Sequence, residues 1–470
     1  MFRPRTPSNA PKGMLSAKAA SGLWRRSYWA LLLIAVALAA YLFFPQSYSA
    51  GRSKVKPLPY DDAAAASGEY KYAVVFDAGS TGSRVHTYKF KAGAGAATLD
   101  LISDDYHHVK PGLSSFADKP KDATTSLEPL MKAALEAVPA SLHAQTPVEL
   151  RATAGLRLLP GGKADAILDA VREYLRAQPF KFEDDMVSVL DGMDEGAYAW
   201  VSLNYLLGRL GKGPEELAAS IDMGGGSMQM AYAVSDGDAD SAPPGYVSKL
   251  SGGGVTYNVY VHSYLGYGLM AGRAGVLAVS DKAAGHPCMP HGPIPEYEYA
   301  GETYDVAPAT DGPSAEACSK AAVQSLKVGE TCEARSTSEC SFNGAWGGPG
   351  LGRRDVYAAS YLFDRAIDVG IVGADATLAK ITPSMYEDMA EKACHEDDAG
   401  TVKGLFRNVR KDKDAQFLCL DLVFCHSVLT GGFGIPGDQE VTLARRIMYN
   451  GDDVEVTWTL GAAINTIGKV

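Results

Sequence analysis

The chain has 470 residues, of which 46% are hydrophobic and 21% charged, a composition too apolar for an intrinsically disordered protein. Its net charge of −11 argues against a general nucleic-acid-binding protein, which should be basic. The charge is unevenly distributed, because the first 56 residues hold nine basic and no acidic residues. Residues 57–470 therefore carry 35 basic and 55 acidic residues, a net charge of −20.

An uncharged apolar segment follows the basic N-terminus. Tyr28–Phe44 spans 17 residues without a charge, and crossing a bilayer takes about 20. Because basic residues precede this segment, the positive-inside rule places residues 1–27 in the cytosol. We expect a cytosolic tail at 1–27, an uncleaved transmembrane signal-anchor at 28–44 and a lumenal stem at 45–70, with a cleaved signal peptide as the alternative.

All seven cysteines lie between Cys288 and Cys425. In an oxidising compartment they indicate three disulfide bonds and one odd thiol, with the pairing left open. Seven reduced thiols in a cytosolic enzyme are the alternative, which the predicted signal-anchor disfavours.

From Tyr72 onward, apolar runs of strand length alternate with segments that have helical spacing of apolar residues. The expected strands lie at Val148–Ala152, Val187–Leu190 and Ser220–Met223, and the expected helices at 124–138, 164–177 and 194–208. This alternation predicts an α/β fold.

A weak internal repeat connects two of the apolar runs. Val74–Ser80 and Ala219–Gly225 each combine a strand-like run with Asp-x-Gly and further small residues, and their aspartates are Asp77 and Asp222. Two copies of one strand–turn–strand unit predict two similar lobes facing each other across a cleft.

Such turns have the chemistry of a phosphate site. Successive backbone N–H groups of a glycine-rich turn bind phosphate oxygens, and the hydroxyls of Ser80, Thr81, Ser83 and Ser227 add donors. An aspartate at the end of each strand can hold a divalent cation, directly or through its water ligands. Metal and amide dipoles would thus let an acidic protein bind a polyanion.

Glu195 lies between the two repeats, near the start of the helix expected at 194–208. A carboxylate at this strand-to-helix junction is placed to orient and deprotonate water. The alternative is a first-turn carboxylate that only stabilises its helix through the helix dipole.

Three further side chains have two interpretations each. Trp346, beside Gly347, is a candidate stacking surface for a nucleobase or a packed core tryptophan. Arg151 and Arg157 would either bind and position phosphate or form salt bridges between lobes.

Together these residues resemble the conserved regions of the apyrases, the nucleoside di- and triphosphate diphosphohydrolases, in the family's order. The matching segments are Phe76–Arg84, Arg151–Leu159, Asp191–Leu207, Ile221–Gln229 and Trp458–Ile464. The resemblance covers about residues 73–470. Gly226 in the fourth segment is similar to plant-type members, and the single N-terminal span resembles the Golgi-type branch.

The resemblance implies an α/β fold with two actin/hexokinase-like lobes, an active-site cleft between them and the N-terminal transmembrane helix. Lobe I would comprise 71–190, completed by 441–470, and lobe II would comprise 191–440 with the disulfides. The cysteine order in the family implies the pairs Cys288–Cys318, Cys332–Cys340 and Cys394–Cys419, which leaves Cys425 odd.

The family also implies roles for individual residues. Glu195 would be the general base for the attacking water, Ser227 and Gln229 would position that water, and Asp77 and Asp222 would hold the hydration shell of Ca²⁺ or Mg²⁺. The residues implied in phosphate or nucleotide binding, with Trp346 as the base-stacking candidate, are Gly79, Ser80, Thr81, Gly82, Ser83, Arg84, Thr153, Gly224, Gly225, Gly226, Ser227 and Trp346.

The expected activity is hydrolysis of the terminal phosphate of nucleoside diphosphates, and of triphosphates as well, clearing UDP and GDP in the Golgi lumen. The expected partners are the nucleotide and the membrane, with no nucleic acid and no obligate protein partner. A plasma-membrane or secreted protein is the alternative location. An exopolyphosphatase-like enzyme or a non-hydrolysing nucleotide-binding protein of the same fold is the alternative function.

Overall fold

The computed structural model describes residues 70–79, 81–92, 99–252, 254–279, 285–332, 339–352 and 354–468. The predicted tail, signal-anchor and stem up to residue 69 lie outside these ranges, as does Ser80. Among the helices formed by the described residues, none combines the length and apolarity that a membrane crossing requires.

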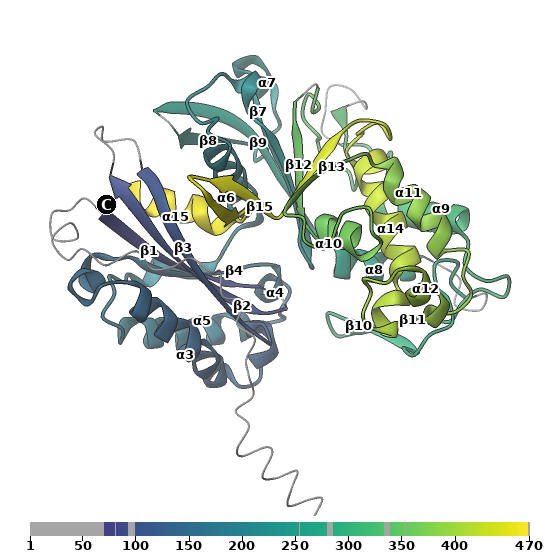
Figure 1. Cartoon of the computed structure of the whole chain (residues 1–470), viewed down its shortest axis with the longest axis horizontal. Coiled ribbons are helices and arrows are strands. Elements are labelled where there is room, and N and C mark those ends of the chain that lie inside the picture. The colour runs from purple at the N-terminus through teal and green to yellow at the C-terminus, as the bar shows by residue number, and fades with distance from the viewer. Residues whose placement is uncertain are drawn as a thin grey trace, which may run out of the picture. The chain divides into compact units, whose positions relative to one another are not determined.

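Five strands form the first sheet (Figure 1). In spatial order they are β3 (Leu99–Val109), β2 (Ser83–Ala92), β1 (Tyr70–Ala78), β4 (Val148–Ala152) and β5 (Val187–Val189). β1, β4 and β5 are parallel, whereas β2 and β3 are antiparallel additions on the other side of β1. The residues that follow β1 and β4 therefore lie at the same edge of the sheet.

Seven strands form the second sheet. In spatial order they are β13 (Leu378–Ile381), β14 (Val441–Ala444), β12 (Val356–Ser360), β6 (Ala219–Met223), β7 (Ser227–Val234), β9 (Val255–Leu265) and β8 (Val247–Gly252). β6, β12 and β14 are parallel, and the other strands are antiparallel to their neighbours.

The two sheets repeat one topology. The order β3-β2-β1-β4-β5 corresponds to β9-β7-β6-β12-β14 in the second sheet. Each repeat starts with a hairpin in which Asp77 pairs with Arg84 or Asp222 pairs with Gln229 across the strands. The predicted α/β fold and the pair of Asp-x-Gly hairpins are confirmed.

Helices cover both faces of the first sheet. Val74 and Phe76 of β1 pack in one cluster with α3 (Pro120–Ala137) and α5 (Lys163–Arg176). Ala73 and Val75 face the opposite way, as alternate residues of a strand must, and pack with α6 (Gly192–Leu206) and α15 (Trp458–Gly468). The three helices predicted by apolar spacing are therefore present as α3, α5 and α6. α3 begins earlier than expected, at Pro120, a residue favoured in the first turn of a helix.

α6 contacts both sheets. Leu203 packs against the first sheet, whereas Trp200 and Val201 pack against β7 and β9 of the second. α6 begins at an Asp191 cap, whose carboxylate accepts a hydrogen bond from the backbone N–H of Met193 at 2.8 Å.

The second sheet is covered on its other face by a larger helical layer, visible in green and yellow in Figure 1. This layer contains α8 (Leu269–Leu277), α9 (Ala315–Leu326), α10 (Tyr361–Asp368), α11 (Ser384–Ala393) and α14 (Leu418–Ser427). The shorter elements are α4 (Ala154–Arg157), α7 (Asp236–Ser241), α12 (Ala399–Leu405), α13 (Asp412–Ala415), β10 (Glu296–Tyr299), β11 (Glu302–Asp305), β15 (Arg446–Tyr449) and β16 (Asp452–Glu455).

Three disulfide bonds lie in or beside this helical layer. They join Cys288 to Cys318, Cys332 to Cys340 and Cys394 to Cys419, as the family resemblance implied. Cys425 is a buried free thiol, and its burial raises its pKa.

β14 lies in the second sheet, between β12 and β13. Residues 441–444 therefore belong to the second sheet. The family resemblance implies instead that 441–470 as a whole complete the first lobe. The sequence of a four-residue apolar strand does not indicate which sheet the strand joins, because either sheet can bury it. The other lobe limits stay a prediction.

Close packing of α15 on α6 predicts a specific sensitivity at Gly461. The N–H of Gly461 donates to the Ser202 hydroxyl at 2.8 Å, and a Cβ at this position would lie 2.3 Å from the carbonyl oxygen of Tyr198. We expect Gly461→Ala to lower the free energy of unfolding by about 1–3 kcal/mol, because backbone must move to admit the methyl group. Thermal unfolding followed by circular dichroism measures this.

The matched control is Gly404→Ala in α12, where a Cβ would meet nothing within 4 Å. Alanine also favours a helix over glycine, so this variant should be as stable as the wild type or more so. Equal stability losses in the two variants would contradict the packing argument.

Candidate active site

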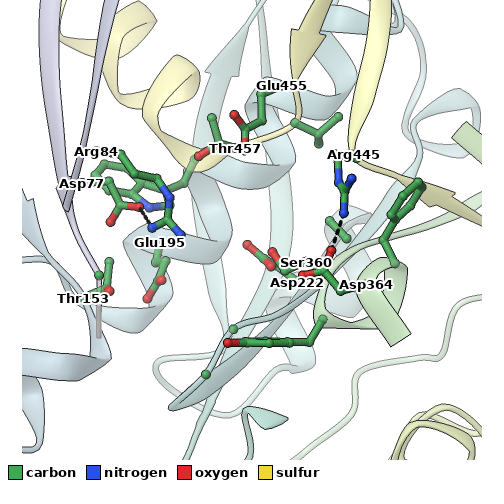
Figure 2. A pocket seen from close by; sticks show the side chains of 18 of the residues that line it. Asp77, Arg84, Thr153, Glu195, Asp222, Ser360, Asp364, Arg445, Glu455 and Thr457 are labelled. Carbon is green, nitrogen blue, oxygen red and sulfur yellow. Dashed lines mark hydrogen bonds and ion pairs between the residues drawn. The ribbon is translucent and has the colours of Figure 1, made fainter. Parts of the chain in front are cut away.

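One pocket of about 260 Å³ lies at the strand ends of the two hairpins (Figure 2). The residues predicted from sequence that line it are Asp77, Gly79, Thr81, Arg84, Thr153, Glu195, Asp222, Gly224 and Gly225. Figure 2 shows Asp77, Arg84, Thr153 and Glu195 on one side of the pocket and Asp222 on the other. The two hairpins and Glu195, far apart in sequence, therefore form a single site.

Asp77 and Asp222 each leave one carboxylate oxygen available. The Oδ2 atom of Asp77 accepts from Arg84 Nη1 at 3.0 Å, whereas its buried Oδ1 has no hydrogen-bond partner. The Oδ1 atom of Asp222 is also buried without a partner. Burial raises the pKa of Asp222, and the charge of Asp77 raises it further, although the nearby hydroxyl of Ser360 opposes this.

These two carboxylates fit a divalent cation. Two unpaired anionic oxygens in a polar pocket are what Ca²⁺ or Mg²⁺ requires of a protein, with water supplying the remaining ligands. A divalent cation is the cofactor expected of this site.

Glu195 is buried, with 9% of its surface exposed. Burial raises its pKa to about 7, and the charges of Asp222 and Asp77 contribute to the increase. The neighbouring guanidinium of Arg157, which forms an ion pair with Glu195, opposes it. Arg157 thus forms an ion pair with Glu195, and its predicted salt bridge between lobes stays a prediction. A carboxylate with a pKa near neutrality is suited to take up and release a proton.

Ser227 and Gln229 lie behind Glu195 and not on the pocket wall. The side-chain amide of Gln229 donates toward Ser227 Oγ at 2.9 Å and lies 3.3 Å from Glu195 Oε2. It also lies 3.0 Å from the hydroxyl of Ser263 on β9. A Cβ at Gly196 would come within 3.1 Å of the Gln229 side chain, so glycine here allows α6 to approach β7 and bring Glu195 to this network.

The second glycine-rich turn directs its N–H groups away from α8. The carbonyl oxygens of Gly224 and Gly225 accept hydrogen bonds from the backbone N–H groups of Leu269 and Ala271, at 2.9 and 3.0 Å. Because C=O and N–H point in opposite directions across a trans peptide, the N–H groups of Gly225 and Gly226 point to the other side, where Gly224 and Gly225 line the pocket. This arrangement leaves backbone donors for phosphate oxygens.

The first turn is described except for Ser80. Gly79, Thr81 and Arg84 line the pocket, whereas Gly82 and Ser83 are buried beside β3 and do not. In the second turn, Gly226 packs against Ala154 of α4 and also lies outside the lining. These three residues therefore shape the turns and do not belong to the pocket lining.

Trp346 does not line the pocket, and the prediction that it stacks on a nucleobase is wrong for this structure. Only 3% of its surface is exposed, and the edge-to-face partners Tyr246 and Tyr260 pack against it. Its indole N–H donates to Glu339 at 3.2 Å. The alternative, a packed core tryptophan, holds because neighbouring aromatic rings occupy its surroundings.

Several lining residues were missed from sequence. They come from the end of β12, from α10, and from the segments around β14 and β16: Ser360, Tyr361, Asp364, Arg445, Glu455 and Thr457. Asp364 and Arg445 form an ion pair of 2.5 Å at the side of the pocket opposite Glu195 (Figure 2). The signal that could have found them is the repeated topology. β12 is the counterpart of β4, and Thr153, which follows β4, was predicted at the site, so the end of β12 could be expected there too.

A family model described as the GDA1/CD39 (nucleoside phosphatase) family matches residues 63–470. Probable apyrase 2 of Oryza sativa subsp. japonica is 42% identical to this chain over 402 residues, covering 84% of the chain and 85% of that protein. Ectonucleoside triphosphate diphosphohydrolase 6 of Mus musculus is 33% identical over 412 residues, covering 86% and 83%.

A crystal structure of nucleoside triphosphate hydrolases from Neospora caninum has a similar fold. Its TM-score is 0.57 at 14% identity, and the match covers 85% of this chain and 94% of that one. The family model spans the part of the chain that holds both Asp-x-Gly hairpins and Glu195, and both sequence relatives match over most of the chain. This chain belongs to the GDA1/CD39 (nucleoside phosphatase) family.

Proposed function

We propose that this nucleoside phosphatase hydrolyses the terminal phosphate of nucleoside diphosphates, with triphosphates as further substrates, using water activated by Glu195. The observation that carries the proposal is the single pocket that combines Glu195 with the carboxylates of both hairpins. A protein that only bound nucleotide would not need a buried carboxylate whose pKa is raised to about 7 at this position.

Hydrolysis requires a water oxygen to bond to the terminal phosphorus while the bond to the leaving nucleotide breaks. Glu195 accepts the proton of that water, and the Gln229 amide, 3.3 Å from Glu195 Oε2, helps to hold that carboxylate in place. Backbone N–H groups of the glycine-rich turns donate to the phosphoryl oxygens, whose charge is spread in the transition state.

Asp77 and Asp222 would hold Ca²⁺ or Mg²⁺, directly or through water. When bound, the cation supplies positive charge that offsets the charge of the phosphate groups. The ion pair between Arg84 and Asp77 holds the guanidinium beside Gly79, where a Cβ would meet Arg84 Nη1 at 3.0 Å. Arg84 is thus positioned to contact phosphate in the first turn.

We further propose that the protein acts in the Golgi lumen and removes the UDP and GDP that glycosyltransferases release. The predicted signal-anchor supports a type II topology. The three disulfide bonds fit an oxidising compartment.

A substrate panel tests the reaction. Purified protein should release phosphate from UDP, GDP and ADP, and from UTP and ATP, when Ca²⁺ or Mg²⁺ is present, and EDTA should abolish the release. Hydrolysis of polyphosphate in preference to every nucleotide would instead identify an exopolyphosphatase. Nucleotide-dependent thermal stabilisation without phosphate release would identify a binding protein.

The Golgi role has a cellular test. Lumenal vesicles from cells that lack the protein should lose most of their UDP- and GDP-hydrolysing activity, and re-expression of the full chain should restore it. Full activity in the deficient vesicles would refute the proposed location or role.

Glu195→Gln should lower kcat by about 10²–10⁴-fold, because the amide cannot accept the proton of the attacking water. Phosphate release from UDP measures this. Glu149→Gln is the matched control, since Glu149 is a buried glutamate with an arginine partner, Arg151, but does not line the pocket. A similar loss in both variants would mean that the effect reflects folding and not catalysis.

The pH profile gives Glu195 a second readout. Since the base must be deprotonated and its pKa is raised to about 7, kcat/KM should rise with pH through this value at low cation concentration. The rise should move to lower pH as the cation saturates, because the cation offsets the charges of Asp77 and Asp222 that help raise this pKa. If the rise of kcat/KM occurred at the same pH at every cation concentration, the proposed effect of the cation on the pKa of Glu195 would be wrong.

A further inference from the structure

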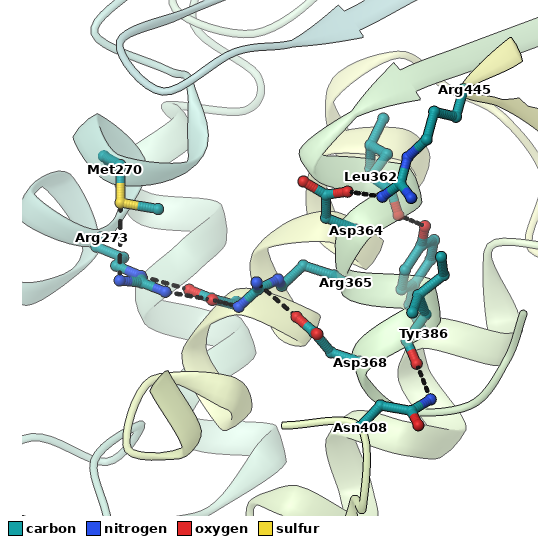
Figure 3. A network of polar contacts seen from close by, with 11 residues as sticks. Met270, Arg273, Leu362, Asp364, Arg365, Asp368, Tyr386, Asn408 and Arg445 are labelled. Carbon is teal, nitrogen blue, oxygen red and sulfur yellow. Dashed lines mark hydrogen bonds and ion pairs between the residues drawn. The ribbon is translucent and has the colours of Figure 1, made fainter. Parts of the chain in front are cut away.

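A buried ionic network joins three helices of the layer that covers the second sheet (Figure 3). Asp421 of α14 is completely buried, and it accepts hydrogen bonds from Arg273 of α8 at 2.7 and 2.6 Å and from Arg365 of α10 at 3.0 Å. Arg365 also pairs with Asp368 on its own helix at 2.5 Å. Two arginines and two aspartates balance in charge, which is what allows such a network to be buried.

One arm of the network holds the helix that shapes the second glycine-rich turn. Backbone N–H groups in the first turn of α8 donate to the carbonyls of Gly224 and Gly225. A Cβ at Gly268, just before α8, would lie 2.5 Å from the carbonyl oxygen of Gly224, so the start of the helix fits against the turn with no room for a side chain. Arg273 lies four residues after Leu269, the first residue of α8, or about one helical turn into it.

The other arm holds the helix that forms part of the pocket wall. Tyr361 and Asp364 of α10 line the pocket. Arg365 follows Asp364 and lies four residues after Tyr361, the first residue of α10. Asp421 therefore ties a point about one turn into α8 to a point about one turn into α10.

The other side-chain hydrogen bonds to the backbone of α10 lead elsewhere. The hydroxyl of Tyr386 on α11 donates to the carbonyl of Leu362 at 2.5 Å, and the amide of Asn408 donates to the carbonyl of Ile367 at 2.7 Å (Figure 3). These bonds hold α10 against α11 and against the segment after α12. The bond between Arg365 and Asp421 is the one that connects α10 to the helix behind the glycine-rich turn.

The two sides of the pocket face different parts of the nucleotide in the proposed reaction. The attacking and leaving oxygens lie roughly in line on opposite sides of the phosphorus. Because the water is activated at Glu195, the leaving nucleotide extends away from Glu195. Asp364 and Arg445 lie on that opposite side (Figure 2). The glycine-rich turn thus meets the terminal phosphate, and the α10 wall meets the leaving part.

We propose that Arg365 is a positioning residue for the nucleotide: through Asp421 it sets the distance between the turn that binds the terminal phosphate and the α10 wall. This role rests on the proposed hydrolase function. Arg365 does not line the pocket and acts through Tyr361 and Asp364, which do. An ionic network fits this role, because its directional hydrogen bonds specify one arrangement of the helices, whereas apolar side chains would be buried at lower cost.

Arg365→Met removes the tie to α10. The pair between Arg273 and Asp421 keeps both of its hydrogen bonds, and the side chain of Asp368 is 24% exposed and can be hydrated, so the variant should fold. We expect the KM for UDP to rise about 3–30-fold, while kcat stays within about 2-fold of the wild type because Glu195 and the glycine-rich turns are unchanged. Phosphate release from UDP at saturating Mg²⁺ measures both constants.

Arg365→Lys is the second variant. An ammonium group can pair with Asp421 or with Asp368 but lacks the fork that reaches both, so the KM for UDP should rise less than in Arg365→Met. A wild-type KM for UDP in either folded variant would overturn the proposal.

Pyrophosphate separates a change in spacing from general damage to the pocket. It has phosphate groups but no nucleoside, so its inhibition constant against UDP hydrolysis should be the same in Arg365→Met and in the wild type. An equal weakening of UDP and pyrophosphate would contradict the proposed role, because it would mean that the phosphate-binding turn itself had moved.

The matched control is Arg209→Met. Arg209 pairs with Asp355 at 2.6 Å, just before β12 begins, and neither residue lines the pocket. Its KM and kcat for UDP should equal those of the wild type. The same rise in KM in Arg209→Met and Arg365→Met would show that loss of any ion pair near β12 is enough, and would reject the specific role of Arg365.

Failure of this inference is distinguishable from failure of the proposed function. Phosphate release from UDP by the wild type, together with an unchanged KM in Arg365→Met, would reject only the role of Arg365. A wild-type protein that releases no phosphate from UDP would reject the proposed function, and with it the role proposed for Arg365.

Discussion

Mutual repulsion among buried carboxylates governs this site. Asp77, Glu195 and Asp222 line one pocket, and both burial and their like charges raise the pKa values of Glu195 and Asp222. Arg157 and Arg84 offset part of this cost through ion pairs with Glu195 and Asp77. The remaining unpaired oxygens favour a divalent cation, which a metal–nucleotide complex contains.

The same electrostatic balance explains how a protein with a net charge of −11 binds a polyanion. Net charge acts over distances that salt screens within about 10 Å, whereas backbone N–H groups and a cation act at contact. The turn at Gly224 and Gly225 presents such groups because its carbonyls are occupied by the first turn of α8. Local dipoles thus decide binding at this site.

Holding these groups together requires close backbone packing and costs conformational strain. Gly196 lets α6 approach β7, and Gly461 lets α15 approach α6, so that Glu195 lies between the two hairpins. Ser360 adopts a conformation that favours glycine, and the buried Arg273–Asp421–Arg365 network stabilises the helices beside it. A buried network of this kind is a costly way to gain stability, so its position behind the pocket indicates a role in geometry.

Much of the fold and site could be predicted because it depends on short-range patterns. The apolar spacing of α3, α5 and α6 and the strand–turn signal of each Asp-x-Gly hairpin are local properties of the chain. The internal repeat indicated that Asp77 and Asp222 would be equivalent, and the position of Glu195 at a helix start indicated its chemistry. The disulfide pairing followed from family resemblance and not from the spacing of cysteines.

The sequence by itself therefore determined the helices α3, α5 and α6, the duplicated hairpin and the principal carboxylates. Only the tertiary structure decided which distant segments complete the pocket, because strand order is set by packing between residues remote in the chain. It placed β14 in the second sheet, enclosed Trp346 among tyrosines, and brought Ser360, Asp364 and Arg445 to the site. No local pattern marks those three residues as part of the site. They reach the pocket because β12 pairs with β6, which brings the end of β12 and the segments that follow it to Asp222.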